Sequence, residues 1–132
     1  MFWSLDIDNH FYLDEENLII YQSFWNGERI DLVSFPSSIK NLTITDSVTW
    51  LHPESFENRV LESLTIDSSE VLLFFTNYYS GYQSLINNIA KATPIIYLKE
   101  GLHIVEDSPF YSKYIKQPLS DKVGYDKYIL NN

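Results

Sequence analysis

A hydrophobic spacing that recurs along this chain restricts the folds it can adopt. Leu42 and Ile44 are followed at fixed intervals by three further apolar residues, Val48, Leu51 and Phe56. The same intervals return at Ile96, Leu98, Leu102, Val105 and Phe110, and with one inserted residue at Leu64, Ile66, Val71, Phe74 and Tyr79. From Leu42 to Leu64 is 22 residues, a period typical of solenoids whose units each supply one short strand. The spacing therefore predicts parallel neighbouring strands that share one core.

The remaining segments are expected to complete a single mostly β domain with short helices over residues 1–132. Residues 1–32 are predicted to form a β-meander, with a hairpin at Asn26-Gly27, that caps a short β-solenoid over residues 33–110. Leu85, Ile86 and Ile89 lie at helical spacing and predict a helix inserted over residues 82–92. Ser108-Pro109 and Ser120-Asp121 are typical of helix starts, so residues 111–132 are expected to form a C-terminal helical cap.

These units resemble the BspA-like, or Treponema-type, class of leucine-rich repeat. The segments Leu61-Glu-Ser-Leu-Thr-Ile66 and Asp46-Ser-Val-Thr-Trp-Leu-His-Pro-Glu-Ser-Phe56 carry the resemblance, which covers residues 33–79 and 95–110. The units are degenerate, since Thr45, Asp67 and Lys99 replace the usual proline. The resemblance implies a leucine-rich-repeat solenoid that binds proteins or surfaces and has no catalytic residues.

Composition excludes several classes of partner and of chemistry. The formal net charge is −9, and residues 1–70 contain 13 acidic residues against three basic ones. Nucleic acids and anionic membranes require a basic face, so neither is an expected partner. The absence of cysteine excludes disulfides, thiolate catalysis and cysteine-based metal sites. No stretch resembles a signal peptide or a membrane span, which predicts a cytoplasmic protein, or a secreted one if a leader has been removed.

The alternation of side chains along the predicted strands gives the first candidate site. If Leu42, Leu64 and Ile96 face the core, their sequence neighbours face outward and share one sheet surface. We expect this surface to bind a protein partner through residues of all three strands: Asn41, Thr43, Thr45, Ser63, Thr65, Asp67, Ile95, Tyr97 and Lys99.

Two further groups of residues are alternative candidates for the surface that binds a partner. Trp50, Leu73 and Ile104 form an apolar stripe at equivalent repeat positions, to be covered either by the helices or by a partner. Five acidic residues of the meander would instead attract a basic partner: Asp6, Asp8, Asp14, Glu15 and Glu16. The alternative function is that of an acidic intracellular inhibitor or immunity-type protein that blocks a basic enzyme. Imitation of nucleic acid by its acidic surface is one way in which it could do so.

Catalysis is not predicted, and neither is a metal or a cofactor. Asp6, Asp8 and His10 alternate on one predicted strand and have the ligand types of a divalent-cation site, but such a pattern is more often a solvated strand edge. The chain contains no nucleophile elbow and no glycine-rich phosphate loop. We therefore expect a non-catalytic protein-binding module.

Overall fold

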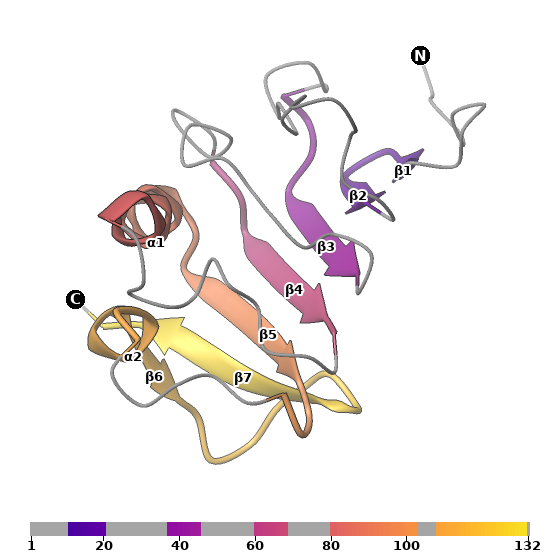
Figure 1. The fold of residues 1–132 in the computed structure, drawn as a ribbon. Helices are drawn as coiled ribbons and strands as arrows, with labels where there is room; N and C mark the ends of the chain where they lie inside the picture. Colours follow the sequence, from indigo (N-terminus) through magenta and orange to yellow (C-terminus); the bar gives the residue numbers. More distant parts are fainter. Residues whose placement is uncertain (1–10, 21–36, 46–59, 69–79, 103–107, 132) are drawn as a thin grey trace.

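The computed structural model describes residues 11–20, 37–45, 60–68, 80–102 and 108–131, whose strands form one seven-stranded sheet (Figure 1). In chain order the elements are β1 (Phe11–Asp14), β2 (Asn17–Ile20), β3 (Asn41–Thr45), β4 (Ser63–Asp67), α1 (Ser80–Ala92), β5 (Ile95–Lys99), α2 (Phe110–Lys113), β6 (Tyr114–Lys116) and β7 (Tyr125–Leu130). Across the sheet the order is β1-β2-β3-β4-β5-β7-β6.

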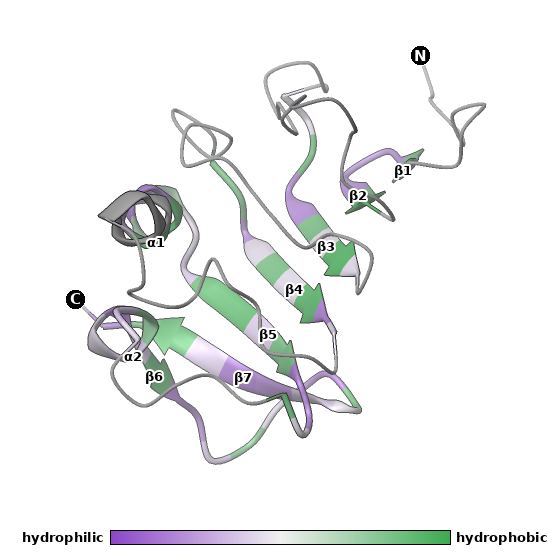
Figure 2. Ribbon diagram, viewed as in Figure 1, coloured by the Kyte–Doolittle hydropathy of each residue, from purple (hydrophilic) through white to green (hydrophobic). Residues whose placement is uncertain are grey.

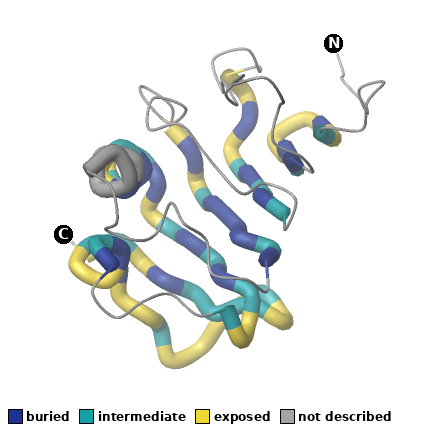
Figure 3. Tube along the Cα trace, in the orientation of Figure 1, coloured by how far each residue is buried: buried dark blue, intermediate teal, exposed yellow. Residues whose placement is uncertain are grey.

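The centre of the sheet is parallel and has the predicted register. Leu42 of β3 is the partner of Leu64 on β4, which is in turn the partner of Ile96 on β5. The residues predicted to face inward are all buried, with exposed fractions between 0% and 3%: Leu42, Ile44, Leu64, Ile66, Ile96 and Leu98. Figure 3 shows this alternation of buried and partly exposed positions along β3 and β5. The repeat spacing thus identified these strands, their direction and their core residues.

The predicted solenoid is nevertheless wrong, because the sheet is open and mixed. β1 pairs antiparallel with β2 at one end, and β7 pairs antiparallel with both β5 and β6 at the other. A solenoid adds each new coil to the free edge of the last one. Here β7 occupies the edge of β5 from the opposite direction, so no further parallel coil can follow.

The predicted C-terminal helical cap over residues 111–132 is also wrong. Among the described residues of this range only α2 is helical, and β6 and β7 form an antiparallel hairpin instead. Tyr125, Tyr128 and Ile129 are aromatic or β-branched and favour a strand, and pairing with β5 adds a full ladder of hydrogen bonds. The Ser120-Asp121 signal belongs to the turn before β7, where Gly124 adopts a φ of 88°.

The N-terminal prediction is correct only in part. β1 and β2 form a hairpin whose turn contains Glu15 at a φ of 48°, but β2 then pairs parallel with β3, which a meander does not do. The predicted strand from Phe2 to Ile7 and the Asn26-Gly27 hairpin lie outside the described residues. The inserted helix is confirmed as α1, which begins at Ser80 rather than at residue 82.

The core lies on one face of the sheet, against both helices. Ile86 and Ile89 of α1 and Phe110 of α2 belong to the same buried cluster as the inward strand residues. Figure 2 shows the apolar positions on β3 and β4 alternating with polar ones. No helix among the described residues is both long and apolar enough to cross a membrane.

A buried aromatic cluster joins the C-terminal hairpin to this core. Phe110 stacks on Tyr114 with ring centroids 5.3 Å apart and meets Tyr128 edge-on at 4.9 Å. The Tyr114 hydroxyl donates a 2.6 Å hydrogen bond to the backbone carbonyl of Thr93, just after α1. Burial raises the pKa of this hydroxyl above its ordinary value, so it stays protonated and remains a donor.

Candidate functional site: the outer face of the sheet

The face of the sheet opposite the core, here called the outer face, carries the first predicted site. On β3, β4 and β5 it consists of the predicted outward residues, which alternate with the buried ones: Asn41, Thr43, Thr45, Ser63, Thr65, Asp67, Ile95, Tyr97 and Lys99. Thr43, Thr65 and Tyr97 are neighbours across the three strands. The predicted placement of these residues on one surface is therefore confirmed.

A ladder of polar side chains crosses the parallel part of the outer face. The Asn41 side-chain amide donates a 3.1 Å hydrogen bond to Oδ1 of Asn17, and the Ser63 hydroxyl donates a 2.7 Å bond to Oδ1 of Asn41. The three residues lie in register on β2, β3 and β4. Because each amide is held by its neighbour, the ladder has a fixed pattern of donors and acceptors.

An apolar strip continues this row on the other half of the sheet. Ile95 of β5, Ile129 of β7 and Ile115 of β6 are successive partners in the register, and they share a face with Ser63. Ile115 is 51% exposed and Ile129 is 37% exposed. The outer face thus presents hydrogen-bonding groups at one end of a row and three isoleucines at the other.

Sequence reasoning missed Ile115 and Ile129 because it assigned both to helices. The signal that identifies them is the alternation of the β7 segment, in which Tyr128 faces the core while Lys127 and Ile129 face away. The turn residue Gly124, directly before β7, reinforces a strand interpretation of that segment.

Lys122, in the loop between β6 and β7, reaches the middle of the outer face with its side chain. Nζ of Lys122 donates a 2.9 Å hydrogen bond to the Thr65 hydroxyl and lies 5.2 Å and 5.1 Å from the ring centroids of Tyr97 and Tyr125. Thr65 is only 2% exposed as a result. Of the predicted surface residues, Thr65 is therefore unavailable to a partner.

Charged groups around this loop compensate one another. The Tyr97 hydroxyl donates a 2.8 Å hydrogen bond to Asp121, whose carboxylate also lies 3.4 Å from the Lys127 amine. Burial and this contact with Asp121 raise the pKa of Tyr97 to about 12. Desolvation lowers the pKa of Lys122, and the nearby carboxylates of Asp67 and Asp121 oppose that shift.

The charged residues at the ends of β4 and β5 also neutralise one another. Asp67 and Lys99 form an ion pair with an N–O distance of 3.5 Å. Since both charges of the pair are already satisfied, this edge of the outer face has little attraction for a charged partner. What it can supply is directional hydrogen bonding beside apolar contact.

The acidic candidate site is described only in part. Asp14, Glu15 and Glu16 lie at the β1–β2 turn, and the two glutamates are exposed. Lys40 lies 3.6 Å from the Glu16 carboxylate and 3.9 Å from that of Glu62, which offsets some of the local negative charge. Asp6 and Asp8 lie outside the described residues.

Two other predicted features also fall outside that part of the chain. The apolar stripe of Trp50, Leu73 and Ile104 lies in segments that the structure does not describe, and so does His10, the histidine of the possible cation site. Within residues 11–20, 37–45, 60–68, 80–102 and 108–131, no group of three acidic, histidine or cysteine side chains is arranged to hold a metal ion.

Comparison with protein-family models, curated proteins and solved structures finds no match to this chain. The resemblance to BspA-like repeats thus stays a prediction that rests on the sequence segments quoted above.

Proposed function

We propose that this chain is a non-catalytic protein-binding module that contacts its partner through the outer face of the sheet. The observation that carries the proposal is the row formed by the Asn17, Asn41 and Ser63 ladder and the isoleucine strip of Ile95, Ile129 and Ile115. Binding interfaces combine apolar contacts with hydrogen-bonding groups, and this row has both next to one another.

The charges predict the chemistry of the partner. Because Asp67 pairs with Lys99 and Asp121 pairs with Lys127, the outer face favours a surface that is apolar and neutral rather than strongly basic. The partner is expected to be a protein with exposed aliphatic or aromatic side chains flanked by amide or hydroxyl groups. A cytoplasmic location is part of the proposal, and fractionation of cells that contain the tagged chain checks it.

Photo-cross-linking from the outer face tests the proposal. A photoreactive residue replaces Ile129 in the full chain, and in a matched control it replaces Val60, an exposed aliphatic residue ahead of β4 that is 74% exposed. We expect a defined protein to cross-link from position 129 and not from position 60. Calorimetry with that purified protein should show binding at least about tenfold weaker for the double variant Ile115→Ser and Ile129→Ser, as expected for central apolar contacts.

The acidic inhibitor remains the second candidate, favoured by the consecutive acids Asp14, Glu15 and Glu16 at an exposed turn. Its signature is a basic partner whose binding weakens with salt and with the change of all three acids to serine. If the triple change abolishes binding while the double isoleucine change has no effect, the outer-face proposal is wrong. Cross-linking of the chain only to a second copy of itself would also contradict it.

A further inference from the structure

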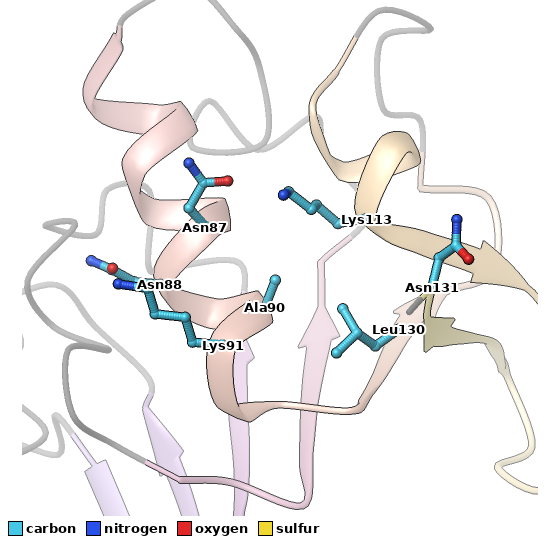
Figure 4. A pocket seen from close by; sticks show the side chains of 7 residues that line it. All are labelled: Asn87, Asn88, Ala90, Lys91, Lys113, Leu130 and Asn131. Atoms are coloured by element: carbon cyan, nitrogen blue, oxygen red, sulfur yellow. The ribbon is translucent and has the colours of Figure 1, made fainter.

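A pocket of about 600 Å³ lies on the other side of the molecule, between α1 and the end of the C-terminal hairpin (Figure 4). Its apolar part consists of Ala90 and Leu130, both of which pack against the core cluster. Asn87 and Asn88 from α1 and Asn131 after β7 supply amide groups around this part. The volume is within the range of small-molecule sites, about 300–1,000 Å³.

Two lysines, Lys91 and Lys113, complete the lining of the pocket, which contains no carboxylate among the described residues. Figure 4 shows the Lys113 side chain extending from the α2 side toward α1 and Asn87. The Lys91 side chain lies on α1 with its polar end beside Asn88. Lys113 is therefore the lysine that extends across the pocket, and Lys91 lies farther from it on α1.

These two lysines differ from the others in the described part of this acidic protein. Lys40, Lys99, Lys116 and Lys127 each lie within 4.0 Å of a carboxylate, with N–O distances of 3.6 Å, 3.5 Å, 3.7 Å and 3.4 Å to their nearest partners. Lys122 lies in the field of Asp67 and Asp121. Within the residues that the structure describes, Lys91 and Lys113 have no carboxylate at such a distance, and both line the same pocket.

We propose that this pocket binds a small organic anion, whose phosphate or carboxylate group contacts Lys113 and whose apolar part lies on Ala90 and Leu130. The amides of Asn87 and Asn131 at the pocket wall donate to the remaining oxygens of the anion. A charged hydrogen bond of this kind is stronger than a neutral one, and the apolar base excludes water from one side of the contact. The site is independent of the outer face, so it adds a ligand to the proposed binding module.

Titration with simple probes tests the site in the full chain. The probes are phenyl phosphate, benzoate, inorganic phosphate and, as a neutral analogue, phenol. We expect phenyl phosphate or benzoate to bind more tightly than inorganic phosphate, which lacks the apolar part, and phenol not to bind. Whichever of the two binds more tightly identifies the preferred anion. In NMR spectra the methyl signals of Ala90 and Leu130 should shift on binding.

A matched pair of lysine variants separates the pocket from general charge attraction. Lys113→Gln should weaken probe binding about tenfold or more, as expected for loss of a charge-assisted hydrogen bond. Lys116→Gln removes the same charge from the next strand, where Lys116 pairs with Asp126, and should leave binding within about twofold, since exposed charges are screened by salt. Thermal melting of both variants checks that they fold.

Three results would overturn the proposal. One is the absence of binding for all four probes, and another is an equal effect of the two lysine variants. The third is a set of shifted methyl signals outside the pocket. None of these results bears on the outer face, because Ile115 and Ile129 lie on the opposite side of the sheet from the core residues that support the pocket.

Discussion

Lys122 determines how the loop between β6 and β7 contacts the sheet. Its amine is held by one hydroxyl and two aromatic rings, from Thr65, Tyr97 and Tyr125, and these contacts come from three different strands. Cation–π contacts contribute about 0.5–2 kcal/mol, depending on how far they are desolvated. Together with the contacts of Asp121, this lysine fixes a loop that the sequence assigns to a helix start, and no periodicity in the sequence indicates its contact with Thr65.

The Tyr97 hydroxyl beside this lysine makes the stability of the folded protein depend on pH in the alkaline range. Its pKa is raised from 10.0 to about 12 in the folded chain, so the folded state retains the proton more strongly than the unfolded state. The contribution to stability is fully present below pH 10 and is lost as the pH rises from 10 toward 12. Thermal melting across this interval should show a steeper decline for the native chain than for Tyr97→Phe.

Asp121→Asn provides the control for this effect. Burial is the first cause of the Tyr97 shift and the contact with Asp121 the second, so the variant should lower the pKa of Tyr97 only part of the way toward 10.0. The absorbance of tyrosinate measures that change. An identical titration in Asp121→Asn would show that the hydrogen bond between Tyr97 and Asp121 is not formed in solution.

At the level of the elements, α2 and the β6–β7 hairpin form one packed unit. Phe110 is fully buried between Tyr114 and Tyr128, and the Tyr114 hydroxyl is bonded to the segment that follows α1. The predicted helix start lies at the right segment, where the Ser108 hydroxyl accepts a 3.2 Å hydrogen bond from the Phe110 N–H, but the N-cap residue is Pro109 rather than Ser108. It starts a helix of only four residues, however, because Tyr114 takes an extended backbone to pair with β7.

Truncation of the central ring tests this unit. Phe110→Ala should lower the free energy of unfolding by about 3–5 kcal/mol, the usual loss for a buried phenylalanine. Tyr111→Ala removes a neighbouring ring that is 43% exposed and should cost much less. Urea denaturation measures both values, and equal losses would mean that the cluster is not the anchor of the hairpin.

At the scale of the whole molecule, the sequence predicts the centre of the sheet better than its margins. The recurring pairs Leu42 and Ile44, Leu64 and Ile66, and Ile96 and Leu98 predict the parallel register because neighbouring parallel strands bury equivalent positions. The same pattern cannot indicate which element covers the last strand. That depends on long-range pairing of β5 with β7, a segment with no repeat spacing of its own.

The sequence also predicts some parts of the candidate sites and not others. The polar half of the outer face follows from alternation on β3 and β4, and sequence reasoning placed it correctly. The isoleucine strip requires β6 and β7 to be strands, and the pocket requires α1 to lie near the end of the C-terminal hairpin. Both depend on tertiary contacts between residues far apart in the chain, such as Tyr114 and Thr93.

The shared core leads to a stability prediction for its central strand. Leu64 is fully buried and lies between Leu42 and Ile96, so Leu64→Ala should destabilise the protein by about 2–5 kcal/mol. Thr43→Ala, on the partly exposed outer face of β3, serves as the comparison and should cost less than about 1 kcal/mol. Chemical denaturation measures both, and a loss below about half a kcal/mol for Leu64→Ala would contradict the assignment of the core.

The antiparallel pairing of β7 with β5 also has a consequence for biosynthesis. β5 is complete at Lys99, but its partner strand begins only at Tyr125, so the nascent chain leaves the ribosome with the edge of β5 unpaired. An uncovered parallel edge of alternating aliphatic residues readily accepts a strand from another chain. Emergence of residues 125–130 ends that interval, because β7 then covers the edge of β5 that could otherwise pair with a neighbouring nascent chain.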